Sequence, residues 1–176
     1  MTSILPKTFT QKLKSKSFIR DLSMFLNKDG PIWLTIKSLA HDLESHKVDY
    51  AIIGGLAVYA HGYERTTTDC DILLSKAYPG DGLIGPVSFP DPKVCQENID
   101  NMKFISLPKL IDLKLTSYKR VPAGRIKDCC DVVELIKTLK LKLSFSSLLD
   151  PSVRNEFEQL VRDLEKDEQK TNINEE

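Results

Sequence analysis

The pattern of apolar and polar positions predicts a mixed α/β domain, with a small mixed sheet flanked by N- and C-terminal helices. Apolar residues recur at helical spacing from Pro31 to about Ser45, and a proline suits the first turn of such a helix. The run 48–53 is short, apolar and rich in residues that favour strands. The further predicted elements are a helix at 56–60, strands at 69–74 and 102–105, and helices at 107–118, from about 125, and from 150 to about 166.

The segment from Tyr78 to Pro92 has a different character, because turn-forming prolines and glycines follow one another closely in it. We expect a loop here, and an ordered one, since apolar side chains can anchor it to the domain. These anchors are Leu83, Ile84, Val87 and Phe89.

Sequence features also predict how the later helices begin and which faces they bury. Ser106 is a suitable cap for the helix at 107–118. Asp150 and Pro151 predict the start of the last helix, which we expect to fade beyond Lys166 into a frayed tail. The buried face predicted for the helix from about 125 consists of Ile126, Cys129, Cys130, Val133 and Ile136.

Length and charge indicate one ordinary domain and leave its partners open. With 176 residues the chain can bury one substantial core. We divide it into a basic helical extension at 1–30, a single domain at 31–166 and a polar tail at 167–176. Lys plus Arg (25) equals Asp plus Glu (25), so no global basic field indicates nucleic-acid binding. No apolar run reaches membrane-spanning length, so we expect a soluble protein.

The cysteines and the N-terminus bear on the cellular compartment. The four cysteines are Cys70, Cys95, Cys129 and Cys130. Their spacing matches no zinc-ligand pattern, and we interpret them as reduced thiols that pack in a cytoplasmic protein. The first twenty residues are basic and contain no acid before Asp21, which resembles an organellar transit peptide. A solvated basic helix or a frayed terminus is the interpretation we favour for them.

Two short patterns carry the candidate chemistry. A strand that ends in Gly54-Gly55 and leads into a helix offers free backbone N–H groups, and the missing Cβ atoms let nucleotide phosphates come close. Asp69 and Asp71 are at positions i and i+2 of a predicted strand, so their carboxylates point to the same side. Two such carboxylates favour Mg²⁺, which bridges triphosphate oxygens. Each pattern alone is more often a turn or a solvated pair, but together they predict a nucleotide site.

This combination resembles the signature of the DNA polymerase β-like nucleotidyltransferase superfamily: Gly-Gly or Gly-Ser after an apolar residue, a helix, then Asp-x-Asp or Asp-x-Glu. The downstream chain is more narrowly similar to small bacterial-type nucleotidyltransferase-like proteins related to the abortive-infection toxins. The segments that carry this similarity are 78–82, 87–92, 107–115 and 125–131. The resemblance covers about 49–154 and implies a strand, Gly-Gly, helix and Asp-x-Asp strand at the centre of the fold.

The resemblance implies roles for individual residues. The nucleotide-binding candidates are Gly54, Gly55, Arg65 and Thr68, and the metal-binding and catalytic candidates are Asp69 and Asp71, with Lys114 as a third catalytic candidate. Lys114 continues an apolar helix face, which is an odd position for a charge without a partner. Asp128 and Asp131, an i, i+3 pair on the next helix, can supply that partner. The alternative is a structural ion pair without chemistry.

One part of the family pattern is missing from this chain. Related proteins place a long segment after the Asp-x-Asp strand, and it ends in a strand with a third carboxylate that helps accept the proton of the attacking hydroxyl. Here the strand at 69–74 runs almost directly into Pro79-Gly80. Asp81, Asp91 and Asp100 are the remaining candidates, and all lie in or beside turn-rich sequence. Loss of the strand would also leave an unpaired sheet edge.

Three functions are compatible with these features. The leading one is a Mg²⁺-dependent nucleotidyltransferase that moves a nucleoside monophosphate from a nucleoside triphosphate to a hydroxyl of RNA or protein, with impaired activity. The second is an inactive module of the same fold that binds nucleotide or a protein partner. The third is a structural or interaction protein that retains only the scaffold, since fold does not fix function.

Overall fold

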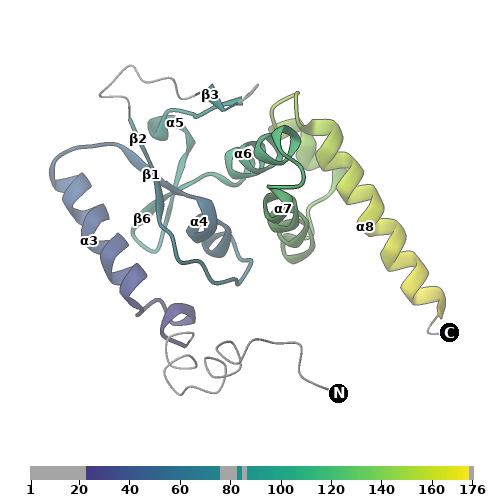
Figure 1. The fold of residues 1–176 in the computed structure, drawn as a ribbon, viewed down its shortest axis with the longest axis horizontal. Helices are drawn as coiled ribbons and strands as arrows, with labels where there is room; N and C mark the ends of the chain where they lie inside the picture. The colour runs from purple at the N-terminus through teal and green to yellow at the C-terminus, as the bar shows by residue number, and fades with distance from the viewer. Residues whose placement is uncertain (1–22, 76–82, 85–86, 175–176) are drawn as a thin grey trace.

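The computed structural model describes residues 23–75, 83–84 and 87–174, which form a mixed sheet with helices around it (Figure 1). In this part of the chain the sheet has four strands, β1 (Tyr50–Ile53), β2 (Asp71–Leu74), β5 (Gln96–Ile99) and β6 (Met102–Ile105). Helices α3 (Pro31–Ser45) and α4 (Gly54–Ala60) lie where helices are predicted. The mixed α/β class is confirmed. None of the described helices combines the length and apolar character needed to cross a bilayer.

Strand β1 lies inside the sheet, whose order is β2-β1-β6-β5. It pairs antiparallel with β2, with Ile53 opposite Asp71, and parallel with β6, with Ile52 opposite Phe104. Burial on both faces explains its continuous apolar sequence. Among the described residues β2 pairs with β1 alone, so β2 lies at an edge of the sheet in this part of the chain.

Strand β5 is not predicted by the apolar pattern. It pairs antiparallel with β6 through a turn in which Asp100 and Asn101 have φ values of 50° and 59°. Such positive values belong to the two-residue turns that join hairpin strands, and Asp and Asn tolerate them. The sequence of β5 is mostly polar because an edge strand can leave side chains in solvent, and this conceals it from a search for apolar alternation.

The region predicted as a loop at 78–92 contains regular structure. Strands β3 (Leu83–Ile84) and β4 (Val87–Ser88) form a short antiparallel pair. The one-turn helix α5 (Pro92–Cys95) comes next, and Asp91 Oδ1 caps it by accepting a hydrogen bond from Lys93 N at 3.0 Å. Residues 76–82 and 85–86, with Asp81 and the Pro79-Gly80 turn, lie outside the described residues, as do the side chains of the anchors predicted in β3 and β4.

The first core lies between the sheet and helices α3 and α4, and it contains an aromatic cluster. The ring centroids of Phe25 and Tyr59 are 5.4 Å apart and those of Phe25 and Trp33 are 5.9 Å apart. Trp33 Nε1 donates to the Phe25 carbonyl at 2.9 Å, and Tyr59 Oη donates to the Leu26 carbonyl at 2.8 Å, so both polar atoms are satisfied. The end of the segment 1–30 therefore packs against the domain from Phe25 onward.

The second core lies among α6 (Leu107–Arg120), α7 (Ile126–Leu139), the 3-10 helix η1 (Leu143–Leu148) and α8 (Arg154–Asn174). Figure 1 shows α6 and α7 between the sheet and α8.

The buried face predicted for α7 is correct at Ile136 but wrong at Ile126, which is 60% exposed, and at Cys130, which is exposed. The buried residues of α7 are Asp131, Val132, Leu135 and Ile136. The helix is rotated so that Asp131 faces α6, because this carboxylate is the partner of the buried Lys114.

The predicted ends of the last helix are also revised. Asp150 Oδ1 accepts a hydrogen bond from Ser152 N at 2.9 Å, and residues 151–153 form turns before α8 begins at Arg154. The helix continues to Asn174, whereas we expected it to fade beyond Lys166. Ion pairs at i, i+3 support this extension. They are Lys166 Nζ to Asp163 Oδ1 and Lys170 Nζ to Asp167 Oδ1, both at 3.4 Å.

Candidate functional site

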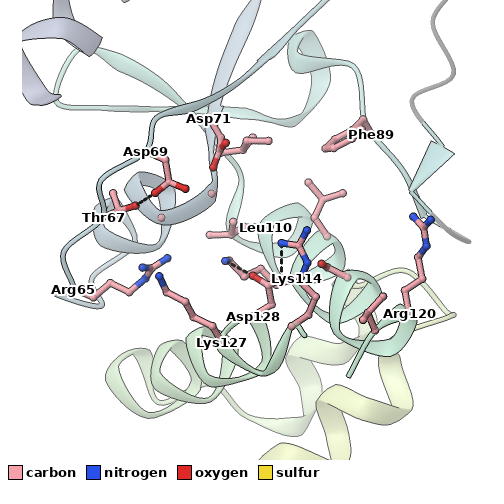
Figure 2. Close-up of a pocket in the computed structure, with 17 residues that line it drawn as sticks. Arg65, Thr67, Asp69, Asp71, Phe89, Leu110, Lys114, Arg120, Lys127 and Asp128 are labelled. Atoms are coloured by element: carbon pink, nitrogen blue, oxygen red, sulfur yellow. Dashed lines mark hydrogen bonds and ion pairs between the residues drawn. The ribbon is translucent and has the colours of Figure 1, made fainter. Parts of the chain in front are cut away.

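A cleft of about 500 Å³ opens between the sheet and helices α6 and α7 (Figure 2). One wall consists of the end of β1, the Gly54-Gly55 turn and the segment 65–71, and the other consists of α6 and the first turn of α7. The predicted site residues that line it are Gly54, Gly55, Arg65, Asp69, Asp71, Lys114 and Asp128. The fold thus brings together residues from separate parts of the chain.

The two glycines are required by the protein's own side chains. Gly54 has a φ of +67°, and a Cβ built on it would lie 2.1 Å from Asp71 Oδ2. A Cβ on Gly55 would lie 2.7 Å from Thr67 Oγ1 and 2.9 Å from Arg65 Nη2. We expected glycine here so that phosphates could approach the backbone. The structure gives a different reason for the two glycines, because a larger residue at either position would displace side chains of the segment 65–71.

Alternation along the segment 65–71 decides which of its side chains reach the cleft. Arg65, Thr67, Asp69 and Asp71 line the cleft, whereas Thr68 is exposed and is not among the lining residues. The side chains that line the cleft are therefore every second one from Arg65 to Asp71, although the chain bends at Thr68 and only Asp71 belongs to a strand. The structure places Thr67, and not Thr68, in the cleft, and the assignment of Thr68 to nucleotide binding stays a prediction.

The two aspartates share the cleft although only one belongs to a strand. Strand β2 begins at Asp71, two residues later than predicted, and Asp69 lies in the extended segment before it. Thr67 Oγ1 donates a hydrogen bond to Asp69 Oδ1 at 2.5 Å, and this bond lowers the pKa of the Asp69 carboxyl. The lowered pKa means that Asp69 stays ionised to a lower pH than an ordinary aspartate does.

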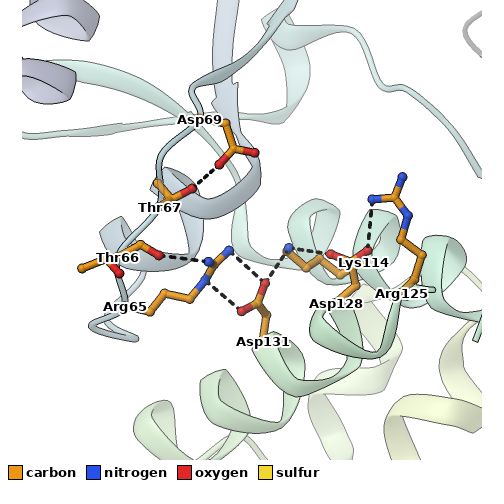
Figure 3. Close-up of polar contacts among 8 residues, drawn as sticks. All are labelled: Arg65, Thr66, Thr67, Asp69, Lys114, Arg125, Asp128 and Asp131. Atoms are coloured by element: carbon orange, nitrogen blue, oxygen red, sulfur yellow. Dashed lines mark hydrogen bonds and ion pairs between the residues drawn. The ribbon is translucent and has the colours of Figure 1, made fainter. Parts of the chain in front are cut away.

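Lys114 is held between two carboxylates, as predicted (Figure 3). Its Nζ lies 2.8 Å from Asp128 Oδ1 and 2.6 Å from Asp131 Oδ2. Arg65 Nε lies 2.9 Å from the other oxygen of Asp131, so this one carboxylate forms ion pairs with both Lys114 and Arg65. The Asp131 side chain is 2% exposed and that of Lys114 is 8% exposed. This is a buried network that joins the segment 65–71 to α6 and α7.

Sequence reasoning missed several lining residues, above all a group of cations. The cleft is also lined by Phe89, Leu110, Leu113, Ser117, Arg120, Val121, Arg125 and Lys127. Arg120, Arg125 and Lys127 flank the turn between α6 and α7, which brings them to one wall. The sequence signal for this group was that its three cations lie close together on both sides of Pro122 and Gly124. The balanced charge of the whole chain concealed it.

Within the part of the cleft that the structure describes, no third acid lies on a neighbouring strand. Asp91 caps α5, and Asp100 lies in the β5–β6 turn where Lys28 pairs with it, so neither lines the cleft. Asp128 is the third acid of the cleft, but it lies on α7 and is bound by Lys114. Among the residues that the structure describes, no group of three or more His, Cys, Asp or Glu side chains is placed to hold a metal.

Replacing Asp131 with Asn should destabilise the fold by about 3 kcal/mol or more, because Arg65 would lose its carboxylate partner and Lys114 would keep only Asp128. Urea unfolding followed by circular dichroism measures this loss. Asp163→Asn is the matched control, since its side chain is 53% exposed, and it should cost less than about 1 kcal/mol. Equal effects of the two substitutions would show that the buried network contributes no more than a surface pair.

Replacing Thr67 with Val should raise the pKa of Asp69 toward the ordinary aspartate value, because the hydroxyl that stabilises the ionised carboxylate is lost. Thr67→Ser keeps the hydroxyl and should keep the low pKa. An NMR titration of the Asp69 carboxyl carbon measures both variants. A low pKa retained in Thr67→Val would assign the shift to another donor.

Comparisons with known proteins add no assignment to this cleft. No protein-family model, curated protein or solved structure matches the chain. Any function assigned to the cleft therefore rests on the geometry and charge of the residues that line it.

Proposed function

We propose that this chain is a nucleotidyltransferase-like protein whose cleft binds a nucleoside triphosphate together with Mg²⁺. The observation that carries the proposal is the opposition of charges across the cleft, with Asp69 and Asp71 on one wall and basic side chains on the other. The cavity of about 500 Å³ lies within the range of about 300–1,000 Å³ typical of small-molecule sites.

The donor set on the acidic wall fits Mg²⁺. Asp69 and Asp71 supply hard carboxylate oxygens, which aspartates carry in ionised form near neutral pH. Mg²⁺ is commonly bound by one or two carboxylates and completes its shell with water and substrate phosphates, so a third protein ligand is not required for binding. The ion would neutralise charge on the triphosphate.

The remaining walls suit the other parts of a nucleotide. Phe89, Leu113 and Val121 give the cleft an apolar surface against which a nucleobase can lie. The buried pairs of Lys114 and Arg65 fix both walls before a ligand arrives, which lowers the entropic cost of binding. These residues bind and orient the nucleotide, and they exclude water from part of the cleft.

Transfer of the nucleotide also requires a base, and the described residues are poorly placed to supply one. In transfer, the acceptor oxygen bonds to the α-phosphorus while the bond to pyrophosphate breaks, and the hydroxyl proton passes to a base. Asp128 is the remaining acid of the described cleft, and its Oδ1 lies 2.8 Å from Lys114 Nζ. This carboxylate is thus already paired with a buried ammonium and is not placed to accept the proton of an attacking hydroxyl without breaking that pair. We therefore favour binding with slow or no transfer over efficient transfer to an RNA or protein hydroxyl.

Asp69→Asn and Asp71→Asn should each abolish the Mg²⁺-dependent part of nucleotide binding, because an amide is a poor ligand for this ion and removes one negative charge. Calorimetry with a nonhydrolysable triphosphate, with and without Mg²⁺, measures the effect. Asp29→Asn is the matched control, since Asp29 is exposed and outside the cleft. Unchanged Mg²⁺-dependent binding in both cleft variants would remove the metal site.

Transfer should be slow or undetectable in the intact chain even where binding is clear, because the described cleft lacks a free carboxylate base. A nucleoside triphosphate radiolabelled at the α-phosphate, incubated with the chain, Mg²⁺ and total RNA, tests for label on RNA or on the protein. Robust Mg²⁺-dependent labelling that is lost in Asp69→Asn would contradict this expectation. It would show that another residue, such as Asp81, accepts the proton.

A further inference from the structure

The charges of the cleft divide into cations with buried partners and cations that face the cavity. Five basic and three acidic side chains line the described part of the cleft. Lys114 and Arg65 are bound by Asp128 and Asp131, which accounts for their burial. A second group of cations, Arg120, Arg125 and Lys127, is exposed around the turn between α6 and α7. The closest acid recorded for this group is Asp128, 3.9 Å from Arg125 Nη1.

Helix stability does not explain two of these three cations. Arg120 ends α6, where a positive charge interacts favourably with the helix dipole. Arg125 precedes the first residue of α7 and Lys127 lies in its first turn, where a positive charge is unfavourable. Asp128 offsets part of this cost, but it is already engaged by Lys114. Helix stability therefore does not account for the positive charge that these two residues place at the start of α7, although Arg125 lies 3.9 Å from Asp128.

The same three side chains surround the mouth of the cleft across from the aspartates. Figure 2 shows Lys127 reaching toward the segment with Arg65, Thr67 and Asp69, while Arg120 extends on the side of Phe89. The positive charge of Lys127 is near enough to contribute to the lowered pKa of Asp69. An anion bound between these walls would lie near both the Lys127 ammonium and the Asp69 carboxylate. A phosphate chain that carries a metal ion can satisfy both groups, whereas a carboxylate without a metal ion would be repelled by Asp69.

We propose that Arg120, Arg125 and Lys127 form a polyphosphate-binding face that holds the terminal phosphates of a nucleoside triphosphate. This inference rests on the proposed function, and it assigns the phosphate contacts to these three residues in place of Lys114 and Thr68. Guanidinium and ammonium groups are the usual partners of phosphate oxygens, and Arg can bind two of them at once. Lys114 then positions α7 by holding Asp128 and Asp131, and it does not contact the phosphates.

The test compares a nonhydrolysable nucleoside triphosphate with the matching nucleoside monophosphate by calorimetry in the presence of Mg²⁺. In the wild-type chain the triphosphate should bind more tightly than the monophosphate. The double variant Arg125→Gln, Lys127→Gln should lose about tenfold or more in triphosphate affinity, as expected for lost charge-assisted hydrogen bonds, with little change for the monophosphate. Arg120→Gln should lose affinity in the same selective way. Arg162→Gln, on the exposed part of α8, should bind as the wild type does.

Inorganic tripolyphosphate and a short single-stranded oligonucleotide separate the other outcomes. If the wild type binds the triphosphate and the three substitutions do not weaken that binding, the assignment of the phosphate contacts to these residues is wrong, while the proposed function stands. If tripolyphosphate binds and the double variant loses it, but no nucleoside triphosphate binds, the face stands and the proposed function fails. Binding of the oligonucleotide alone, lost in the double variant, would overturn the assignment to polyphosphate. Thermal unfolding confirms that each variant is folded.

Discussion

The Asp131 carboxylate is the interaction on which the rest of the site depends. Its two oxygens receive Arg65 Nε at 2.9 Å and Lys114 Nζ at 2.6 Å, so it ties the segment 61–70 to both α6 and α7. That segment contains neither helix nor strand, and it has no ladder of backbone bonds to fix its path. A buried carboxylate is costly without partners, and here two cations offset the cost of its desolvation.

The position of Arg65 sets the direction of the later side chains in its segment. Once Arg65 is held by Asp131, alternation directs Thr67, Asp69 and Asp71 to the same wall of the cleft. Gly54 and Gly55 leave the space that these side chains occupy, so the Gly-Gly turn and the segment 65–71 depend on each other sterically. The two hydrophobic cores meet at Leu107, which packs against both.

Much of this arrangement could be predicted from sequence because its signals are local. The run before Gly54 identifies β1, and the lysine on an apolar helix face identifies the pair with Asp128 and Asp131. The rest depends on information that a local pattern does not contain. Strand β5 is polar because it lies at an edge, and the rotation of α7 results from an ion pair with another helix. Counting every second residue back from Asp69 would have predicted Thr67 rather than Thr68 in the cleft, but we used this spacing only for the two aspartates.

The network that assembles the cleft also limits its chemistry. Lys114 needs acidic partners because it is buried, and Asp128 is one of them. This acid of the cleft therefore neutralises the lysine. Freeing Asp128 as a base would leave Lys114 with Asp131, which Arg65 already shares. Binding makes no such demand, because the aspartates of the opposite wall remain directed into the cleft while the network stays intact. The acids that can meet a ligand, Asp69 and Asp71, are therefore different residues from the acids that neutralise Lys114, so the charges that hold the two walls together are separate from those offered to a ligand.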